Sequence, residues 1–127
     1  EWDIMRTHAQ KGADILNAYE DPLFHMAADI AACHHERFDG SGYPQKLRGD
    51  AIPLSARITT LVDTYDALRS KRPYKSSFSH EHALEVLSTG DNRTKPEHFD
   101  PALVAILMRH QDLIREVYDN DVEGAHP

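Results

Sequence analysis

Apolar residues recur along this chain at the three- and four-residue spacing of amphipathic helices, and the pattern breaks where proline and glycine gather. From this spacing we predict five helices, over residues 3–19, 22–36, 54–70, 79–90 and 101–117. No segment alternates cleanly enough to predict a strand, although a short pairing within residues 47–52 is left open. The pattern therefore predicts an all-α fold, a helical bundle of about five helices.

Capping signals support the ends of these helices. Pro22 and Pro101 suit the first helical positions, where proline has no hydrogen-bonded N–H to lose. Ser79 and Asp100 are residue types that cap helix N-termini, and Gly90 suits the left-handed conformation that ends a helix. The boundaries of the predicted helices therefore rest on local chemistry as well as on periodicity.

Residues 37–53, between the second and third predicted helices, read as a long loop. The loop contains Asp39-Gly40-Ser41-Gly42, a run of turn-forming residues, and is bounded by Pro53. We expect Arg57, just after it, to brace the loop. Loops of this length without regular structure are often functional, so we expect a site nearby.

Composition narrows the classes of function. The chain has 127 residues, 40% of them apolar, which is enough for one domain that buries roughly two-thirds of its unfolded surface. Acidic residues number 21 against 14 basic ones, and the net charge of -7 argues against a nucleic-acid binder or an anionic-membrane binder. Any site that binds an anion must therefore draw its positive charge from a few neighbouring basic residues rather than from the chain as a whole.

The single cysteine, Cys33, fits a reducing compartment, since it cannot form an internal disulfide. No apolar run reaches the ~18 residues of a membrane span and no leader opens the chain, so we expect a soluble, cytoplasmic domain. The sequence begins at Glu1 inside a predicted helix. This start suggests a piece of a longer protein and a bundle that is incomplete at its N-terminus.

His8 lies near the centre of the apolar stripe of the first predicted helix, with Gly12 leaving room beside it. The stripe is formed by Ile4, Met5, Ile15 and Tyr19. We therefore expect a buried imidazole. A lone buried histidine is more often a core residue bonded to a backbone carbonyl than a metal ligand, so both interpretations stay open at this point.

The second predicted helix carries two adjacent histidines, His34 and His35, on its apolar sides. The charged face of the same helix holds His25, Asp29 and Glu36, which we interpret as a solvated surface. Two inward imidazoles each need partners for their ring nitrogens, since buried polar groups without partners cost free energy. A metal ion would supply such a partner, and imidazole is a common ligand for Zn, Fe and Mn.

Asp63 lies nearly opposite the apolar face of the third predicted helix, and helical periodicity alone therefore makes it exposed. The residues around it are small or polar rather than basic: Ala56, Thr59, Thr60, Asp66 and Ala67. Small residues allow a neighbouring element to approach. From spacing alone, Asp63 is equally compatible with an exposed carboxylate and with a metal ligand.

Several motifs stand in order along the chain. They are His34-His35-Glu36-Arg37-Phe38-Asp39-Gly40-Ser41-Gly42-Tyr43-Pro44, Ile52-Pro53, Ala56-Arg57-Ile58, Val62-Asp63, Tyr65-Asp66-Ala67-Leu68 and Arg72-Pro73-Tyr74-Lys75. With these motifs the chain resembles the HD-GYP family of cyclic-di-GMP phosphodiesterases over roughly residues 1–110. The resemblance implies a bacterial signalling hydrolase with an HD-domain-like helical bundle. It makes residues 1–118 the C-terminal part of that domain, ahead of an acidic tail at 119–127.

The resemblance also implies a metal centre. Its ligands, by matching positions, are His8, His34, His35 and Asp63. Two or three divalent ions are implied, with iron or manganese favoured and zinc, nickel or magnesium compatible with the same ligands. Substrate-lining positions correspond to Tyr43, Asp66, Ala67, Arg72 and Lys75, the last two bringing positive charge to the phosphodiester.

The chain departs from the family in one respect. It contains no His-Asp dipeptide, although the family's dyad and the lysine shortly after it normally precede the position of His8. The dyad aspartate bridges the metals and the lysine handles the phosphate, so we assign no catalytic residue within the chain and expect these 127 residues alone to be inactive. We expect this aspartate and this lysine to lie upstream of Glu1 in a longer protein, because a start inside a helix favours truncation.

Two other functions remain as alternatives. One is a non-catalytic module that binds cyclic-di-GMP, or that docks a diguanylate-cyclase domain through the Tyr43-Pro44 loop. The other is a general nucleotide phosphohydrolase of the HD superfamily, against which the long glycine loop argues. Missing helices would leave apolar surface exposed, so a homodimer is a further hypothesis.

Overall fold

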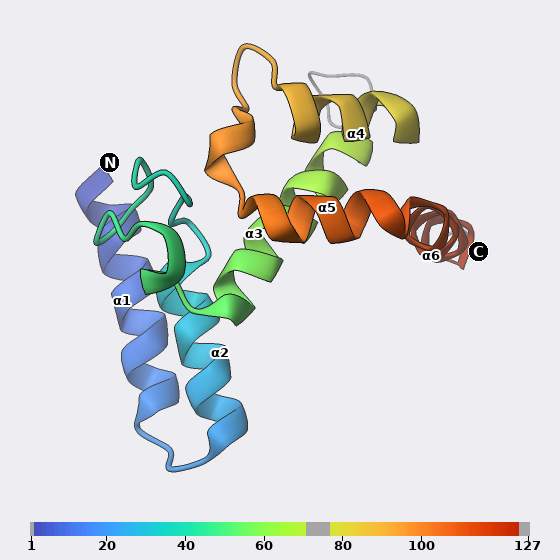
Figure 1. The fold of residues 1–127 in the computed structure, drawn as a ribbon. Helices are drawn as coiled ribbons and strands as arrows, with labels where there is room; N and C mark the ends of the chain where they lie inside the picture. The colour runs from blue at the N-terminus through green and yellow to red at the C-terminus, as the bar shows by residue number, and fades with distance from the viewer. Residues whose placement is uncertain (1, 71–76, 125–127) are drawn as a thin grey trace. The chain divides into compact units, whose positions relative to one another are not determined.

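The computed structural model describes residues 2–70 and 77–124, and every regular element within them is helical (Figure 1). The main helices are α1 (Trp2–Asn17), α2 (Pro22–Cys33), α3 (Leu54–Arg69), α4 (His80–Thr89), α5 (Pro101–Arg109) and α6 (Gln111–Gly124). Short 3-10 turns lie at η1 (Gly49–Ala51) and η2 (Pro96–His98). The all-α class is confirmed, and the pairing considered within residues 47–52 is wrong, because η1 forms there instead.

Most helix ends fall where the capping signals predict them. Pro22 begins α2, and the Asp21 carboxylate accepts a 2.8 Å hydrogen bond from the backbone N–H of Leu23. The Ser79 hydroxyl accepts from the His82 N–H at the start of α4, and Gly90 ends that helix with a φ of 87°. Each end thus satisfies backbone groups that a bare helix terminus would leave without partners.

Two ends differ from the sequence prediction. Helix α2 stops at Cys33 rather than near residue 36, and His34 is its C-cap. The last predicted helix is divided at His110, whose N–H is shared between the carbonyls of Ile106 and Leu107. Such sharing is typical of a last helical turn that tightens. Beyond the break, α6 continues to Gly124, into the residues predicted as a tail.

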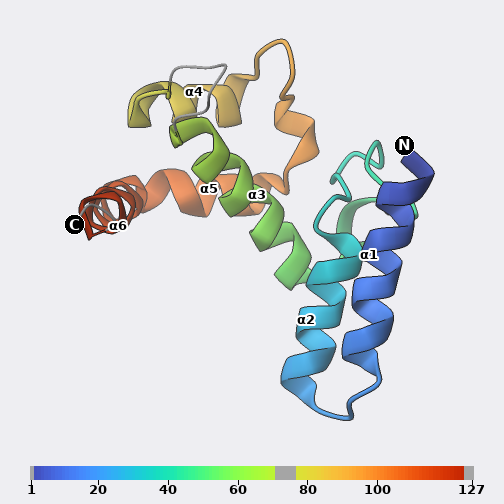
Figure 2. The ribbon, with the colours of Figure 1, turned by 180° about the vertical axis from the view of Figure 1, so that it is seen from behind.

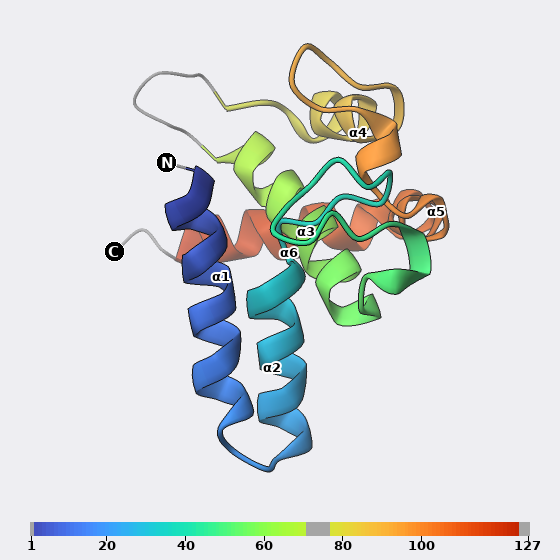
Figure 3. The same cartoon turned by 90° about the vertical axis from the view of Figure 1, so that its left-hand side faces the viewer.

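The chain divides into two compact units, Glu1–Val62 with Glu97–Asp100, and Asp63–Pro96 with Pro101–Pro127. In the first unit, α1 and α2 run side by side in opposite directions, joined by a short turn (Figures 2 and 3). Their contact is made of small residues, because Ala13 and Ala28 are buried and a Cβ on Gly12 would lie 3.5 Å from the Cβ of Ala31. The backbones therefore approach closely.

This packing corrects the predicted orientation of α1. The large apolar side chains expected to face the core are exposed: Ile4, Met5, Ile15 and Tyr19. The buried positions are instead Ala9 and Ala13, about one helical step around the surface. Helical periodicity locates an apolar stripe, but the small-residue face beside it is the one that fits against α2.

A second cluster anchors the long loop of the first unit. Cys33, Ile52 and Ala56 are buried together, with Ala32 and Leu47 packed against them. Arg57 donates from Nε to the carbonyl of Ile52 at 2.9 Å and from a terminal nitrogen to Asp100 at 2.7 Å. The prediction that Arg57 braces the loop is confirmed.

The second unit contains a chain of hydrogen-bonded polar groups, in which Tyr65 and His80 are buried. Arg69 donates to the Tyr65 hydroxyl at 2.7 Å and to Asp119 on α6 at 3.0 Å. Because Tyr65 accepts from Arg69, its own proton goes to Nδ1 of His80, 2.8 Å away. His80 then carries its ring proton on Nε2, a buried atom without a hydrogen-bond partner among the described residues.

We expect this network to make the second unit sensitive to acid. Burial lowers the pKa of His80, and Arg69 and Arg115 lower it further. The unfolded chain then binds a proton near pH 6.5 more readily than the folded one, so stability falls as the pH drops below that value. The expected slope is at most about 1.4 kcal/mol per pH unit, measured by urea unfolding between pH 7 and pH 5.

His80→Asn should remove this part of the slope, because the asparagine oxygen can still accept from Tyr65 but does not titrate. His25→Asn, at an exposed position, is the matched control and should keep the slope. An unchanged slope in His80→Asn would show that His80 is not the titrating group.

Candidate functional site

A hollow of about 320 Å³ opens between α1 and α2 in the first unit. Its lining consists of Met5, His8, Ala9, Ala31, His34 and His35. Three of the four predicted metal ligands therefore border one hollow, His8 from α1 and the two adjacent histidines from the end of α2. The close helix contact described above is what brings these two sources together.

His8 is exposed, which corrects the prediction of a buried imidazole. The reason is the orientation of α1, which buries Ala9 and Ala13 and leaves the large apolar stripe around His8 exposed. His8 also borders a second hollow of about 230 Å³ with Ile4, Thr7 and Lys11. The His8 ring is thus accessible from solvent and borders both hollows.

His34 has a defined ring orientation. Its Nδ1 lies 2.7 Å from the carbonyl oxygen of Ile30, one turn earlier on α2. A carbonyl oxygen only accepts, so Nδ1 carries the proton and the neutral ring keeps its lone pair on Nε2. Metal-binding histidines are commonly oriented in this way, by a carbonyl that accepts from the other ring nitrogen. The tautomer of His34 therefore suits metal ligation.

His35 is placed by ring contacts on two sides. Its centroid lies 3.9 Å from that of His34, and it stacks on Tyr43 with centroids 4.9 Å apart and an angle of 18°. His35 is exposed and Tyr43 partly buried. The prediction that both histidines face inward is thus half right, because α2 ends at Cys33 and the helical wheel no longer applies beyond it.

Glu36 lies in an environment that helical periodicity does not predict. The helical pattern predicts a solvated face for Glu36, with His25 and Asp29, yet Glu36 is only 1% exposed. Its two carboxylate oxygens accept from the backbone N–H groups of Gln45 and Leu47, each at 2.8 Å. An acidic residue directly before a glycine-rich loop was the available signal, since such a loop offers backbone donors.

Two nearby groups with shifted pKa values also bear on the site. Burial raises the pKa of Asp39, but hydrogen bonds from the hydroxyl and amide of Ser41 outweigh this, so the net pKa is lowered. Burial raises the pKa of the Cys33 thiol, and Glu36 and Asp29 raise it further. Cys33 is therefore held as a neutral thiol rather than as the thiolate that metals bind.

The remaining predicted site residues lie outside the first unit or outside the described residues. Asp63, Asp66 and Ala67 are on α3 in the second unit, with both carboxylates exposed, as periodicity predicts for Asp63. Arg72 and Lys75 fall at residues 71–76, which the structure does not describe. Within residues 2–70 and 77–124, no group of three His, Cys, Asp or Glu residues is arranged to hold a metal ion.

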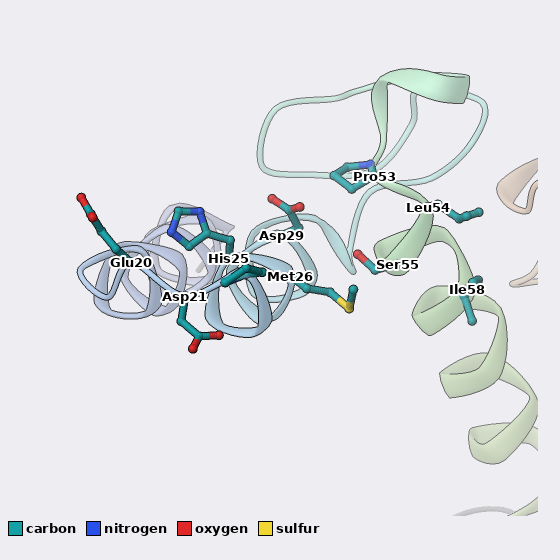
Figure 4. A pocket seen from close by; sticks show the side chains of 10 residues that line it. Glu20, Asp21, His25, Met26, Asp29, Pro53, Leu54, Ser55 and Ile58 are labelled. Carbon is teal, nitrogen blue, oxygen red and sulfur yellow. The ribbon is translucent and has the colours of Figure 1, made fainter.

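A larger hollow, of about 980 Å³, lies along α2 and the start of α3 (Figure 4). It contains three carboxylates, Glu20, Asp21 and Asp29, and one imidazole, His25. The three carboxylates point in different directions in Figure 4, and Asp21 already caps α2. This hollow therefore has no converging ligand set.

None of the described helices is long and apolar enough to cross a membrane.

Comparisons with known proteins find a matching family model and several similar proteins. A protein-family model described as the HD domain matches residues 1–103. The chain is 46% identical, over 88% of its length, to a 3'3'-cGAMP-specific phosphodiesterase of Vibrio cholerae. It is 39% identical, over 92%, to a cyclic di-GMP phosphodiesterase response regulator of Xanthomonas campestris, and 34% identical, over 99%, to a cyclic di-GMP phosphodiesterase of Thermotoga maritima.

A solved structure is also similar. The crystal structure of a cyclic GMP-AMP-specific phosphodiesterase from Vibrio cholerae matches with a TM-score of 0.63 and 25% identity, over 84% of this chain and 23% of the other. The chain spans 21%, 30% and 34% of the lengths of the three relatives named above. HD-domain phosphohydrolases depend on divalent metals. The family-model match over most of the chain, together with these relatives, shows that it belongs to the HD-domain family, in its HD-GYP group.

Proposed function

We propose that this chain is part of a divalent-metal-dependent phosphodiesterase that hydrolyses cyclic-di-GMP in bacterial second-messenger signalling. The observation that carries the proposal is the meeting of His8, His34 and His35 at one hollow, with the His34 lone pair left on Nε2. The names of the relatives support the same reaction class. A docking module without catalysis would not need three imidazoles at one hollow.

The proposed metal ligands are His8, His34, His35 and Asp63. Histidine and carboxylate ligands suit iron and manganese, our first choices, as well as zinc, nickel and magnesium. Two or three such ions would lower the pKa of a water and neutralise charge on the phosphoryl oxygens. The three histidines fit this role in ligand type, but the described residues do not complete a metal site.

Further ligands are therefore needed. The sequence contains no His-Asp dipeptide and so lacks the family's bridging aspartate and the lysine that follows it. We expect the 127-residue chain alone to bind metal weakly and to turn over no substrate. Residues 1–118 form the proposed C-terminal part of an HD-GYP domain, and 119–127 the proposed acidic tail.

The proposed substrate contacts are Tyr43 from the loop, Asp66 and Ala67 from α3, and Arg72 and Lys75. A chain with a net charge of -7 needs local cations to accept a phosphodiester, and these two basic residues would provide them. The Tyr43-Pro44 loop is also the proposed contact for a diguanylate-cyclase domain. A cytoplasmic location and a homodimer complete the proposal.

A second substrate, 3'3'-cGAMP, is favoured by one specific observation. The relative that is 46% identical is named as specific for it, and a relative from the same organism that is named for cyclic di-GMP is 44% identical. Both substrates are cyclic dinucleotides with the same phosphodiester chemistry. A preference for one of them would therefore have to come from residues that contact the bases, because the metal centre would act on the same phosphodiester group in both.

His35→Ala in the full-length protein should reduce turnover of cyclic-di-GMP to background. Loss of residues that merely support a ligand costs 10- to 100-fold in metal affinity or activity, so loss of a ligand should cost more than about 100-fold. Metal content and product formation, followed by chromatography, measure the effect. His25→Ala, at an exposed position on α2 that does not line this hollow, is the control, and turnover retained in His35→Ala would contradict the assignment.

A substrate panel decides between the candidate substrates. Full-length protein loaded with Mn²⁺ should hydrolyse cyclic-di-GMP with a kcat/KM at least about tenfold above that for 3'3'-cGAMP, the equivalent of about 1.4 kcal/mol in transition-state binding. A reversed ratio would assign the second substrate. Hydrolysis of mononucleotides alone would point to the general phosphohydrolase, and binding without turnover or metal would point to the regulatory module.

A further inference from the structure

The carboxylate of Glu36 is buried and fully engaged within the protein. It is only 1% exposed, and its two oxygens each accept one backbone N–H, from Gln45 and from Leu47, at 2.8 Å. Hydrogen bonds to a charged acceptor are roughly twice as strong as neutral ones. Glu36 therefore ties the end of α2 to residues nine and eleven positions later in the chain.

The backbone between these points is folded back tightly. A Cβ on Gly42 would lie 2.4 Å from both the Arg37 nitrogen and the His35 oxygen, so only glycine fits. The N–H of Tyr43 donates to the same His35 carbonyl at 3.2 Å. The segment around Tyr43 is thus pressed against the residues that follow α2.

This fold-back places the Tyr43 ring on His35. The Tyr43 and His35 rings are nearly parallel, at an angle of 18° and with centroids 4.9 Å apart. The centroid of the His34 ring lies 3.9 Å from that of the His35 ring. The path from Glu36 to the hollow is therefore short: carboxylate, backbone of residues 45 and 47, Tyr43 ring, His35 ring.

We propose that Glu36 is a positioning residue, which acts through the loop and Tyr43 to orient the His35 imidazole at the hollow. Its relevance to catalysis rests on the proposed function, but the positioning itself does not. Glutamine cannot substitute, because its amide has one acceptor oxygen and one NH₂ group, so one backbone N–H would face a donor.

The first test uses the 127-residue chain without metal. In Glu36→Gln, the ¹H–¹³C signals of the His35 ring should move away from the positions set by the Tyr43 stack, and amide exchange at Gln45 and Leu47 should accelerate more than about tenfold. Glu97→Gln, an exposed position in the same unit, is the matched control and should leave both unchanged. His35 signals in Glu36→Gln that match the control would overturn the proposal.

Should Glu36→Gln fail to fold, two measurements still decide. Tyr43→Leu keeps the carboxylate contacts and should reproduce the His35 displacement, and the wild-type Gln45 and Leu47 amides should exchange slowly although they lie in a loop. Unmoved His35 signals in Tyr43→Leu, or fast exchange of both wild-type amides, would overturn the proposal.

A second arm addresses catalysis in the full-length protein. Glu36→Gln should weaken Mn²⁺ affinity by 10- to 100-fold and lower kcat more than KM, as expected when the support of a metal ligand is lost. An unchanged Mn²⁺ affinity with displaced His35 signals would overturn the link to the metal centre. Wild-type protein without phosphodiesterase activity would defeat the proposed function, while the spectra still decide the role of Glu36.

Discussion

The close approach of α1 and α2 is the constraint on which the site depends. Alanines and one glycine form the contact, and a Cβ on Gly12 would already touch Ala31. Larger side chains here would separate the two backbones and with them His8 and the His34–His35 pair. The small-residue face therefore has a functional consequence: it brings imidazoles from two helices to one hollow.

The end of α2 at Cys33 is the second determinant. Had the helix continued through Glu36, the two histidines would have diverged by about 100° and the glutamate would have faced solvent. Because it stops, His34 caps the helix, His35 lies between two aromatic rings, and the Glu36 carboxylate turns into the loop. One helix end thus determines the surroundings of three consecutive polar residues.

The sequence predicted much of the fold because its signals were local. Pro22, Ser79 and Gly90 mark helix ends through their own backbone chemistry, and the structure places the ends there. The prediction of which face of α1 is buried was wrong. Packing partners, rather than periodicity, decide whether an apolar stripe or a small-residue face is buried. The burial of Glu36 escapes periodicity for a related reason, since the partners of its carboxylate are nine and eleven residues away.

Within the site, type and spacing indicated the histidines, while the family resemblance raised Asp63 from an open question to a proposed ligand. A crystal structure of the full-length protein with Mn²⁺, with anomalous scattering to locate the metal, tests the account most directly. We predict a peak roughly 2.0–2.3 Å from Nε2 of His34, with His35 and His8 in the same metal cluster. Peaks remote from these three rings would contradict it.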